Sequence, residues 1–165
     1  MIQKELVLQK QYPKTIVRTT PDGFRVADSK KNTINDSSGK KLHILFAEDK
    51  IIQQKVIYLM LTSLGHTVTI ARNGNLALEL FRPGKFDLIL MDIQMPVMDG
   101  VAATQKLKKK YKNLPPIVGL SANASEGDRE KYMAMGLDEY LTKPVKKNDF
   151  KRLICKIFTC HEFSL

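Results

Sequence analysis

The stretch that decides the fold is Phe86-Asp87-Leu88-Ile89-Leu90-Met91-Asp92-Ile93-Gln94-Met95-Pro96-Val97-Met98-Asp99-Gly100. Its first half is a short apolar run bounded by turn signals, a pattern typical of a buried strand. Asp92 follows this run directly, although core strands seldom end in a charge. The same arrangement occurs upstream, where His43-Ile44-Leu45-Phe46-Ala47 leads straight into Glu48 and Asp49. Two buried strands that each deliver carboxylates at their C-terminal ends indicate a divalent-cation site.

Strand and helix patterns alternate from residue 42 onward. In the first helical pattern, Ile52, Val56, Leu59 or Met60, and Leu64 recur at helical spacing. The expected strands are 42–47, 67–71, 86–91, 116–120 and 138–142. The expected helices are 51–64, 74–82, 100–111, 125–135 and 147–159. We therefore predict an α/β fold, with a doubly wound, five-stranded parallel sheet in the flavodoxin-like order 2-1-3-4-5.

This topology predicts where the site lies. Ligands of open α/β sheets bind beyond the carboxyl ends of the strands, at the switch point between the first and third strands. The strand ends at this edge bring together Glu48, Asp49, Asp92, Ser121, Ala122 and Lys143. Clustered carboxylates repel one another and favour a hard cation, for which Mg²⁺ is suited. A hydroxyl and an ammonium suit phosphoryl oxygens, and a carboxylate can act as the nucleophile that accepts the phosphoryl group.

Composition shifts divide the chain into four parts. Residues 28–41 are polar and have linker composition, and they separate an N-terminal segment, residues 1–27, from a domain of residues 42–160. The N-terminal segment contains Thr20-Pro21-Asp22-Gly23, which is turn chemistry for a short hairpin. An isolated hairpin is marginal in water, so we expect this segment to be disordered or docked elsewhere. Residues 161–165 form a C-terminal tail.

Composition also limits the class of protein. The chain has 165 residues, 43% apolar and 27% charged, which is typical of a soluble globular protein. We find no stretch long enough to span a bilayer and no secretory signal. Cys155 and Cys160 suit neither a redox pair nor a zinc site, so we expect thiols in a reducing, cytoplasmic compartment.

The net charge of +10 raises the question of nucleic acid. The excess is spread along the chain, and residues 1–42 carry nine basic and four acidic residues. Two lysine-rich clusters lie at 106–112 and 143–152. Tyr111 is the single aromatic residue that we count for base stacking, because Phe150 belongs to the apolar stripe of the expected last helix. We expect both clusters to be solvated helix faces. A regulator that binds nucleic acid through its basic N-terminal tail is the alternative.

Residues 42–160 resemble a response-regulator receiver domain of two-component signalling, and most of all the receivers of hybrid sensor kinases. Four segments carry the resemblance. They are Phe46-Ala47-Glu48-Asp49, residues 90–100, Leu120-Ser121-Ala122-Asn123-Ala124, and residues 135–144 with Tyr140 and Lys143-Pro144.

The resemblance implies a role for each site residue. Asp92 would be the phosphoacceptor, catalytic together with Lys143. Asp49, Asp92 and the backbone carbonyl of Gln94 would hold Mg²⁺, or Mn²⁺ in its place, with Glu48 acting through water. Ser121 and Lys143 would bind phosphoryl oxygens. Tyr140 matches the aromatic switch position, small Ala122 would leave room for movement, and the Lys143-Pro144 bond would be cis.

The resemblance also implies partners. The donor would be a histidine kinase or a histidine phosphotransfer protein. The chain would catalyse only its own phosphorylation and dephosphorylation, so we expect no other enzyme activity. A homodimer would form through the face of helix 125–135, strand 138–142 and helix 147–159. We expect no membrane insertion.

Two residues depart from the hybrid-receiver pattern. Lys50 and Gln53 stand where asparagine is common. Lys50 could weaken cation binding or extend into water, and we favour the second because it would begin a helix.

The sequence disfavours three other functions. A transcription factor would need an output domain, and only five residues follow residue 160. A hydrolase of the haloacid dehalogenase type would need an acid where Gln94 stands. A degenerate receiver would lack side chains that are all present here.

Overall fold

The structure is a computed structural model that describes residues 40–122 and 127–159. The N-terminal segment with its expected hairpin, most of the linker, Cys160 and the C-terminal tail lie outside the described residues. The expected start of the helix at residue 125 also lies outside them. Within the described part of the chain, no helix is long and apolar enough to cross a membrane.

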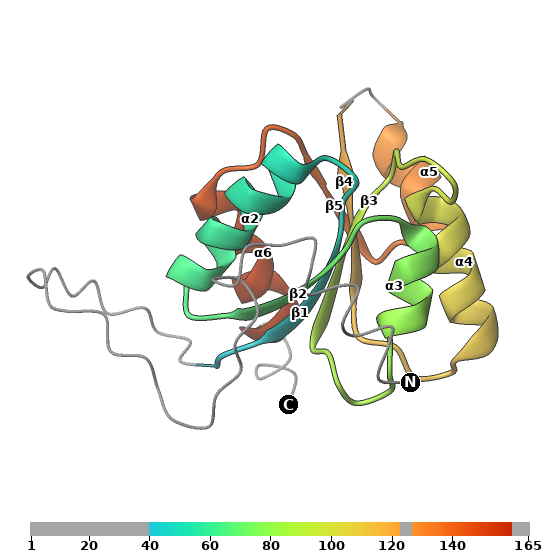
Figure 1. Cartoon of the computed structure of the whole chain (residues 1–165), viewed down its shortest axis with the longest axis horizontal. Coiled ribbons are helices and arrows are strands. Elements are labelled where there is room, and N and C mark those ends of the chain that lie inside the picture. The colour runs from blue at the N-terminus through green and yellow to red at the C-terminus, as the bar shows by residue number, and fades with distance from the viewer. Residues whose placement is uncertain (1–39, 123–126, 160–165) are drawn as a thin grey trace, which may run out of the picture. The chain divides into compact units, whose positions relative to one another are not determined.

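Five strands form one parallel sheet (Figure 1). They are β1 (His43–Ala47), β2 (Thr67–Ala71), β3 (Leu88–Asp92), β4 (Ile117–Ser121) and β5 (Glu139–Thr142). Their order is β2-β1-β3-β4-β5, as the sequence predicted. Each strand after β1 is reached by a helical crossover, which is how a parallel sheet becomes covered on both faces.

The helices cover the sheet on two sides (Figure 1). They are α2 (Ile51–Ser63), α3 (Gly74–Leu80), α4 (Gly100–Lys110), α5 (Asp128–Ala134) and α6 (Lys147–Thr159). In Figure 1, α2 and α6 lie on one face of the sheet, and α3, α4 and α5 lie on the other. The crossovers therefore switch sides between β1 and β3, which places the switch point of the fold at the ends of these two strands.

Strand residues alternate between two hydrophobic cores, one on each face. Phe46 and Leu90 face the core beneath α2 and α6, together with Ile57, Leu61 and Phe150. Leu45 and Ile89 face the core beneath α3, α4 and α5, together with Phe81 and Leu107. Strands β3 and β4 are buried along their whole length. This explains why the sequences of these strands are apolar without alternation.

Several element boundaries differ from the sequence prediction. Asp92 and Ser121 are the last residues of β3 and β4, not the first residues after them. Helix α3 ends at Leu80 and Phe81 is extended. The expected end at residue 82 is disfavoured because Arg82 directly precedes Pro83, and the residue before a proline avoids helical backbone. Helix α5 begins at Asp128, behind Gly127 at φ 90°, which provides no side-chain cap.

Helix α2 buries a different stripe from the one that the apolar spacing suggested. Its buried residues are Gln54, Ile57 and Leu61. Ile52, Val56 and Leu59 are exposed instead, by 78%, 45% and 64%. Gln54 is buried because its amide donates a 2.6 Å hydrogen bond to the Glu48 carbonyl, which fixes the rotation of the helix. The helix was predicted correctly, but its outward face is apolar.

Candidate functional site

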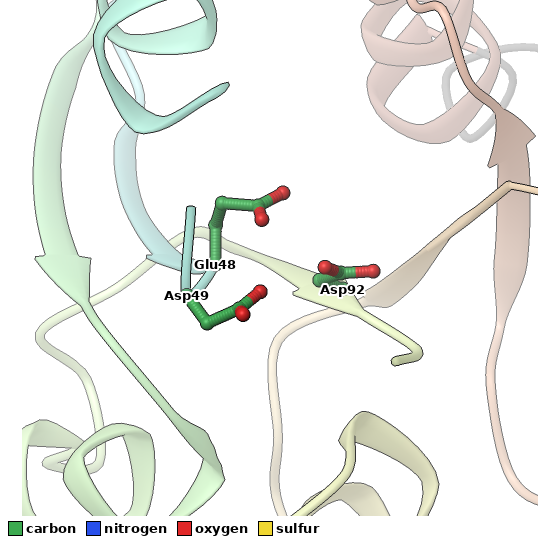
Figure 2. A group of neighbouring side chains, drawn as sticks. All are labelled: Glu48, Asp49 and Asp92. Atoms are coloured by element: carbon green, nitrogen blue, oxygen red, sulfur yellow. The ribbon is translucent and has the colours of Figure 1, made fainter. Parts of the chain in front are cut away.

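Three carboxylates meet at the ends of β1 and β3 (Figure 2). Glu48 and Asp49 follow β1, Asp92 ends β3, and the two upstream side chains extend toward Asp92. One oxygen of each lies within 4.8 Å of the others. Glu48 and Asp92 are buried. Three carboxylates held this close, two of them buried, need positive charge nearby.

Backbone contacts at the strand ends fix these positions. The Glu48 N–H donates to the Ala71 carbonyl at 2.9 Å, and the Ile93 N–H donates to the Leu120 carbonyl at 3.0 Å. The start of α4 packs against β3 so closely that a Cβ on Gly100 would lie 2.1 Å from the Asp92 carbonyl oxygen. Asp99 then caps α4 by accepting the Ala102 N–H at 2.7 Å. Asp92 is therefore held by a rigid frame.

Lys143 supplies the positive charge. Its Nζ donates to Glu48 Oε2 at 2.7 Å and lies 3.0 Å from Asp92 Oδ2. The backbone N–H of Lys143 donates to the Ser121 carbonyl at 2.7 Å. This bond extends the pairing of β4 and β5 by one residue beyond the end of β5. The Lys143–Pro144 peptide bond is cis. The lysine side chain is 14% exposed, so its ion pairs are screened little by water.

Gln53 is a residue whose role the sequence did not reveal. Its Oε1 accepts a 2.8 Å hydrogen bond from Lys143 Nζ. The lysine ammonium has three donors, and its three neighbours here are Glu48, Asp92 and Gln53. Gln53, which stands where asparagine was expected, therefore lies within the site. Its side chain contacts the Lys143 ammonium directly.

The neighbours of Glu48 act on its pKa in opposite directions. Burial raises the pKa of its carboxyl above the ordinary 4.5, and the hydrogen bond from Lys143 acts in the opposite direction. The negative charge of Asp92 raises this pKa further, and the Lys50 N–H, at 3.1 Å from Oε1, lowers it. Both Glu48 oxygens therefore already have donors.

Asp49 differs from Glu48 in one informative way. Its Oδ1 is buried and has no hydrogen-bond partner within residues 40–122 and 127–159. A buried carboxylate oxygen without a donor is costly, unless a cation binds it. This oxygen belongs to the three-carboxylate cluster, so the donor set fits a hard divalent cation. The Gln94 N–H lies 3.3 Å from Asp92 Oδ1, which places the Gln94 backbone beside the same cluster.

The remaining predicted residues lie around this centre. Ser121 is buried at the end of β4, and its Oγ lies 3.2 Å from the Tyr132 hydroxyl. Ala122 is exposed. Tyr140 is half-buried in β5 and packs against the core beneath α3, α4 and α5. Lys50 is exposed, as expected for a side chain that extends into water, although it also lines the cleft described next.

A cleft of about 370 Å³ opens over Asp92. One wall is α2, which contributes the exposed apolar residues Ile52 and Val56. The lining residues are Lys50, Ile52, Gln53, Val56, Ile57, Asp92, Gln94, Ala122, Lys143, Pro144 and Val145. The site therefore combines a carboxylate, a lysine, and access from the surface beside an apolar helix face.

Comparison with known families identifies this arrangement. Residues 44–155 match the response regulator receiver domain. The chain belongs to this family. Its candidate site residues lie at the strand ends that the predicted topology indicated.

Curated relatives are hybrid sensor kinases. The chain is 38% identical over 119 residues to the aerobic respiration control sensor protein ArcB of Escherichia coli, covering 71% of this chain and 15% of ArcB. It is 40% identical over 110 residues to hybrid signal transduction histidine kinase I of Dictyostelium discoideum, covering 62% of this chain and 6% of that protein. The chain thus spans a small part of these relatives. Their names give no support to the nucleic-acid alternative.

Solved receiver domains share the fold. The receiver of the sensor histidine kinase PA1611 from Pseudomonas aeruginosa, with magnesium in its active-site cleft, is 37% identical, with a TM-score of 0.64 over 72% of this chain and 98% of that one. The receiver of Ssk1 from Saccharomyces cerevisiae, solved with the phosphotransfer protein Ypd1, gives a structure match that is 29% identical, with a TM-score of 0.65 over 73% and 91%.

Proposed function

We propose that Asp92 accepts a phosphoryl group from a phosphohistidine on a histidine kinase or histidine phosphotransfer protein. The observation that carries this proposal is the position of its carboxylate. Asp92 lines a surface cleft, lies 3.0 Å from Lys143 Nζ, and shares an oxygen cluster with Glu48 and Asp49. In the reaction, an Asp92 oxygen forms the new bond to phosphorus while the phosphorus–nitrogen bond of the donor breaks and the imidazole leaves.

Each neighbouring group has a distinct role in this proposal. Phosphoryl transfer needs charge stabilisation and positioning more than further covalent chemistry. Lys143 would move from Asp92 to a phosphoryl oxygen, and the Ser121 hydroxyl would donate to another. Asp49, Asp92 and the Gln94 carbonyl would hold Mg²⁺ or Mn²⁺, with Glu48 acting through water. A bound cation would neutralise charge on the phosphoryl oxygens. We propose no enzyme activity beyond self-phosphorylation and dephosphorylation.

The test is phosphorylation by a small donor. We expect one hydroxylamine-labile phosphoryl group on the chain after incubation with acetyl phosphate and Mg²⁺, detected by intact mass spectrometry. Asp92→Asn should remove it. Asp99→Asn is the matched control, because asparagine also caps a helix N-terminus and Asp99 is exposed. A phosphoryl group that persists in Asp92→Asn would refute the assignment.

The apolar face of α2, formed by Ile52, Val56 and Leu59, supports a protein as the donor. These side chains are exposed by 45% to 78%, and Ile52 and Val56 also line the cleft over Asp92. A contiguous apolar surface beside a reactive group is typical of a docking site. We infer that a histidine phosphotransfer protein binds here while its phosphohistidine enters the cleft.

This docking has its own test. Ile52→Ser and Val56→Ser should slow phosphotransfer from a phosphorylated histidine phosphotransfer protein by about tenfold or more, as anchors at a docking site do. Phosphorylation by acetyl phosphate should be unchanged, because the small donor needs no docking. Lys55→Ser, an exposed change on the same helix, is the control. If the phosphorylation rate fell equally with the protein donor and with acetyl phosphate, Ile52 and Val56 would act on the reactivity of Asp92 and not on docking.

We also propose an output face and a location. The face of α5, β5 and α6 would form a homodimer after phosphorylation, and light scattering with and without beryllofluoride tests this. Support comes from Tyr140, which lies in this region and contacts the core below it. A cytoplasmic location is also proposed, and its support is the match to the receiver family.

A further inference from the structure

Tyr132 on α5 touches the site from a direction that the proposed reaction does not use. Its side chain is buried, with 9% exposed, and it belongs to the core beneath α3, α4 and α5. Its hydroxyl lies 3.2 Å from Ser121 Oγ, and either oxygen can be the donor. Ser121 is itself 3% exposed, so water has little access to the pair.

The contact fixes where the Ser121 hydroxyl lies. Side chains at positions 117, 119 and 121 of a strand share one face of the sheet. On β4 this is the α5 side, because Ile117 belongs to that core and a Cβ on Gly119 would meet Leu137. The Ser121 Oγ is thus held against α5. A phosphoryl group on Asp92 would lie instead beyond the carboxyl end of β3, the strand that pairs with β4.

We propose that Tyr132 is a positioning residue that holds the Ser121 hydroxyl against α5 in the resting state and competes with the phosphoryl group for it. This inference rests on the proposed role of Asp92. The Ser121 hydroxyl has one proton and one rotamer at a time. When Oγ turns toward a phosphoryl oxygen, it leaves the tyrosine, and that bond is lost. Tyr132 therefore stabilises the resting state and lowers the affinity for the phosphoryl group.

The tyrosine also connects the site to the output face. Its ring centroid lies 5.8 Å from that of Tyr140, with the planes tilted by 53°. Release of the Tyr132 hydroxyl and movement of Tyr140 occur in one packed pair, so each influences the other. Ser121, Tyr132 and Tyr140 thus form a continuous path from β4 to α5 and β5.

The contact between Tyr132 and Ser121 is also compatible with a purely structural role for Tyr132. Buried hydroxyls are hydrogen-bonded in nearly all proteins, and Tyr132 could bond Ser121 for that reason alone. The two roles predict different results. A structural bond would affect the free energy of unfolding and leave phosphoryl binding unchanged. A positioning bond changes the affinity for a phosphoryl mimic, and only while the Ser121 hydroxyl is present.

The experiment measures the dissociation constant of beryllofluoride, in saturating Mg²⁺, by ¹⁹F NMR. Tyr132→Phe keeps the ring and removes the hydroxyl. A hydrogen bond changes an equilibrium by roughly two- to tenfold, and 3.2 Å is long for two hydroxyl oxygens, so we expect Tyr132→Phe to bind about threefold tighter. Tyr111→Phe is the control, because Tyr111 packs edge-on against Phe81 outside the cleft lining. It should bind as wild type does.

A double-mutant cycle completes the test. In a Ser121→Ala background, adding Tyr132→Phe should leave the dissociation constant unchanged. If Tyr132→Phe alone bound beryllofluoride as wild type does, or more weakly, the inference would be overturned. The same holds if Tyr132→Phe raised the affinity for beryllofluoride equally in the Ser121→Ala background. If wild type neither binds beryllofluoride nor is phosphorylated on Asp92, the proposed function fails and this inference fails with it. If wild type does both, a negative result concerns Tyr132 only.

Discussion

Lys143 Nζ lies 3.0 Å from Asp92 Oδ2, although β4 separates the strands from which the two residues come. The lysine follows β5 and its side chain crosses the carboxyl end of β4 to reach the acid at the end of β3. A compact ammonium at the end of a flexible stem can make this contact and then turn to a phosphoryl oxygen. A planar guanidinium has a different shape and a fixed fork of donors.

We therefore expect Lys143→Arg to accept phosphate but to fail in transmitting the signal. The charge is kept, so acetyl phosphate should still modify Asp92. The Tyr140 resonances should not shift on phosphorylation as they do in wild type, which NMR can follow. Lys146→Ala, an exposed lysine three residues along, is the control and should switch normally. The roles would be reversed if Lys143→Arg switched and Lys146→Ala did not.

Cation binding should depend on Asp49 more than on Glu48. The Asp49 Oδ1 has no hydrogen-bond partner in the described part of the chain, whereas Lys143 and the Lys50 N–H already bind the two Glu48 oxygens. We expect Asp49→Ala to weaken Mg²⁺ binding by more than about tenfold and Glu48→Ala by less, measured by calorimetry. Chelator should abolish phosphorylation. Equal affinities in wild type and both variants would exclude this cation site.

Gln53 should contribute to the position of Lys143. Its Oε1 accepts a 2.8 Å bond from the ammonium, and hydrogen bonds to charged groups contribute about 1.5–3 kcal/mol. Gln53→Ala should lower the free energy of unfolding by about 1 kcal/mol, because two carboxylates still hold the lysine, and should slow phosphorylation by acetyl phosphate. Gln105→Ala, an exposed change on α4, is the control. A phosphorylation rate equal to that of wild type would show that Gln53 is dispensable.

The sequence predicted the sheet and the site because both depend on local signals. Apolar runs of strand length and helical spacing between them determine a parallel sheet, and the topology then determines which strand ends meet. Glu48, Asp92 and Lys143 each stand at such an end, so their convergence could be predicted without coordinates. Their hydrogen bonds could not, because side-chain reach and rotamer depend on packing.

The outward face of α2 shows where this reasoning stops. The helix carries apolar residues around most of its circumference, so two stripes compete for the sheet. The buried stripe includes Gln54, a polar residue that the apolar pattern disfavours, because its amide bonds the Glu48 carbonyl. The contact between Ser121 and Tyr132 was hidden for a similar reason. It depends on how α5 packs on β4, and no spacing in the sequence reports that.

Gly100→Ala should destabilise the protein. A Cβ there would lie 2.1 Å from the Asp92 carbonyl oxygen, which is backbone and cannot turn aside. Overpacking of this kind costs about 1–3 kcal/mol or more, which exceeds the gain of about 1 kcal/mol from alanine in a helix. Gly65→Ala is the comparison, because its Cβ would meet nothing within 4 Å and only its φ of 90° opposes alanine. Urea unfolding should show the larger loss for Gly100→Ala, and the reverse order would contradict the clash.

The free energy of unfolding should fall at low pH because of Glu139. This residue begins β5, and its carboxylate binds Arg129 of α5 and Lys156 of α6, so it joins both helices to the strand between them. Burial alone would raise the pKa of Glu139, but the hydrogen bonds from Lys156, the Tyr140 N–H and Arg129 prevail and lower it below the ordinary 4.5. Because the folded pKa is the lower one, this stabilisation is fully present above pH 4.5 and is lost as the pH falls through the folded value.

Glu139→Gln tests this dependence. Both cationic partners are more than half exposed, so water screens them and we expect a loss of only about 1 kcal/mol at pH 7. The difference in unfolding free energy between wild type and Glu139→Gln should shrink as urea titrations move below pH 4.5, because the wild-type carboxyl becomes neutral. Glu79→Gln, a change of an exposed acid on α3, should give a curve parallel to wild type. If the Glu139→Gln difference stayed constant down to acid pH, the interactions of Glu139 with Arg129 and Lys156 would not depend on its charge.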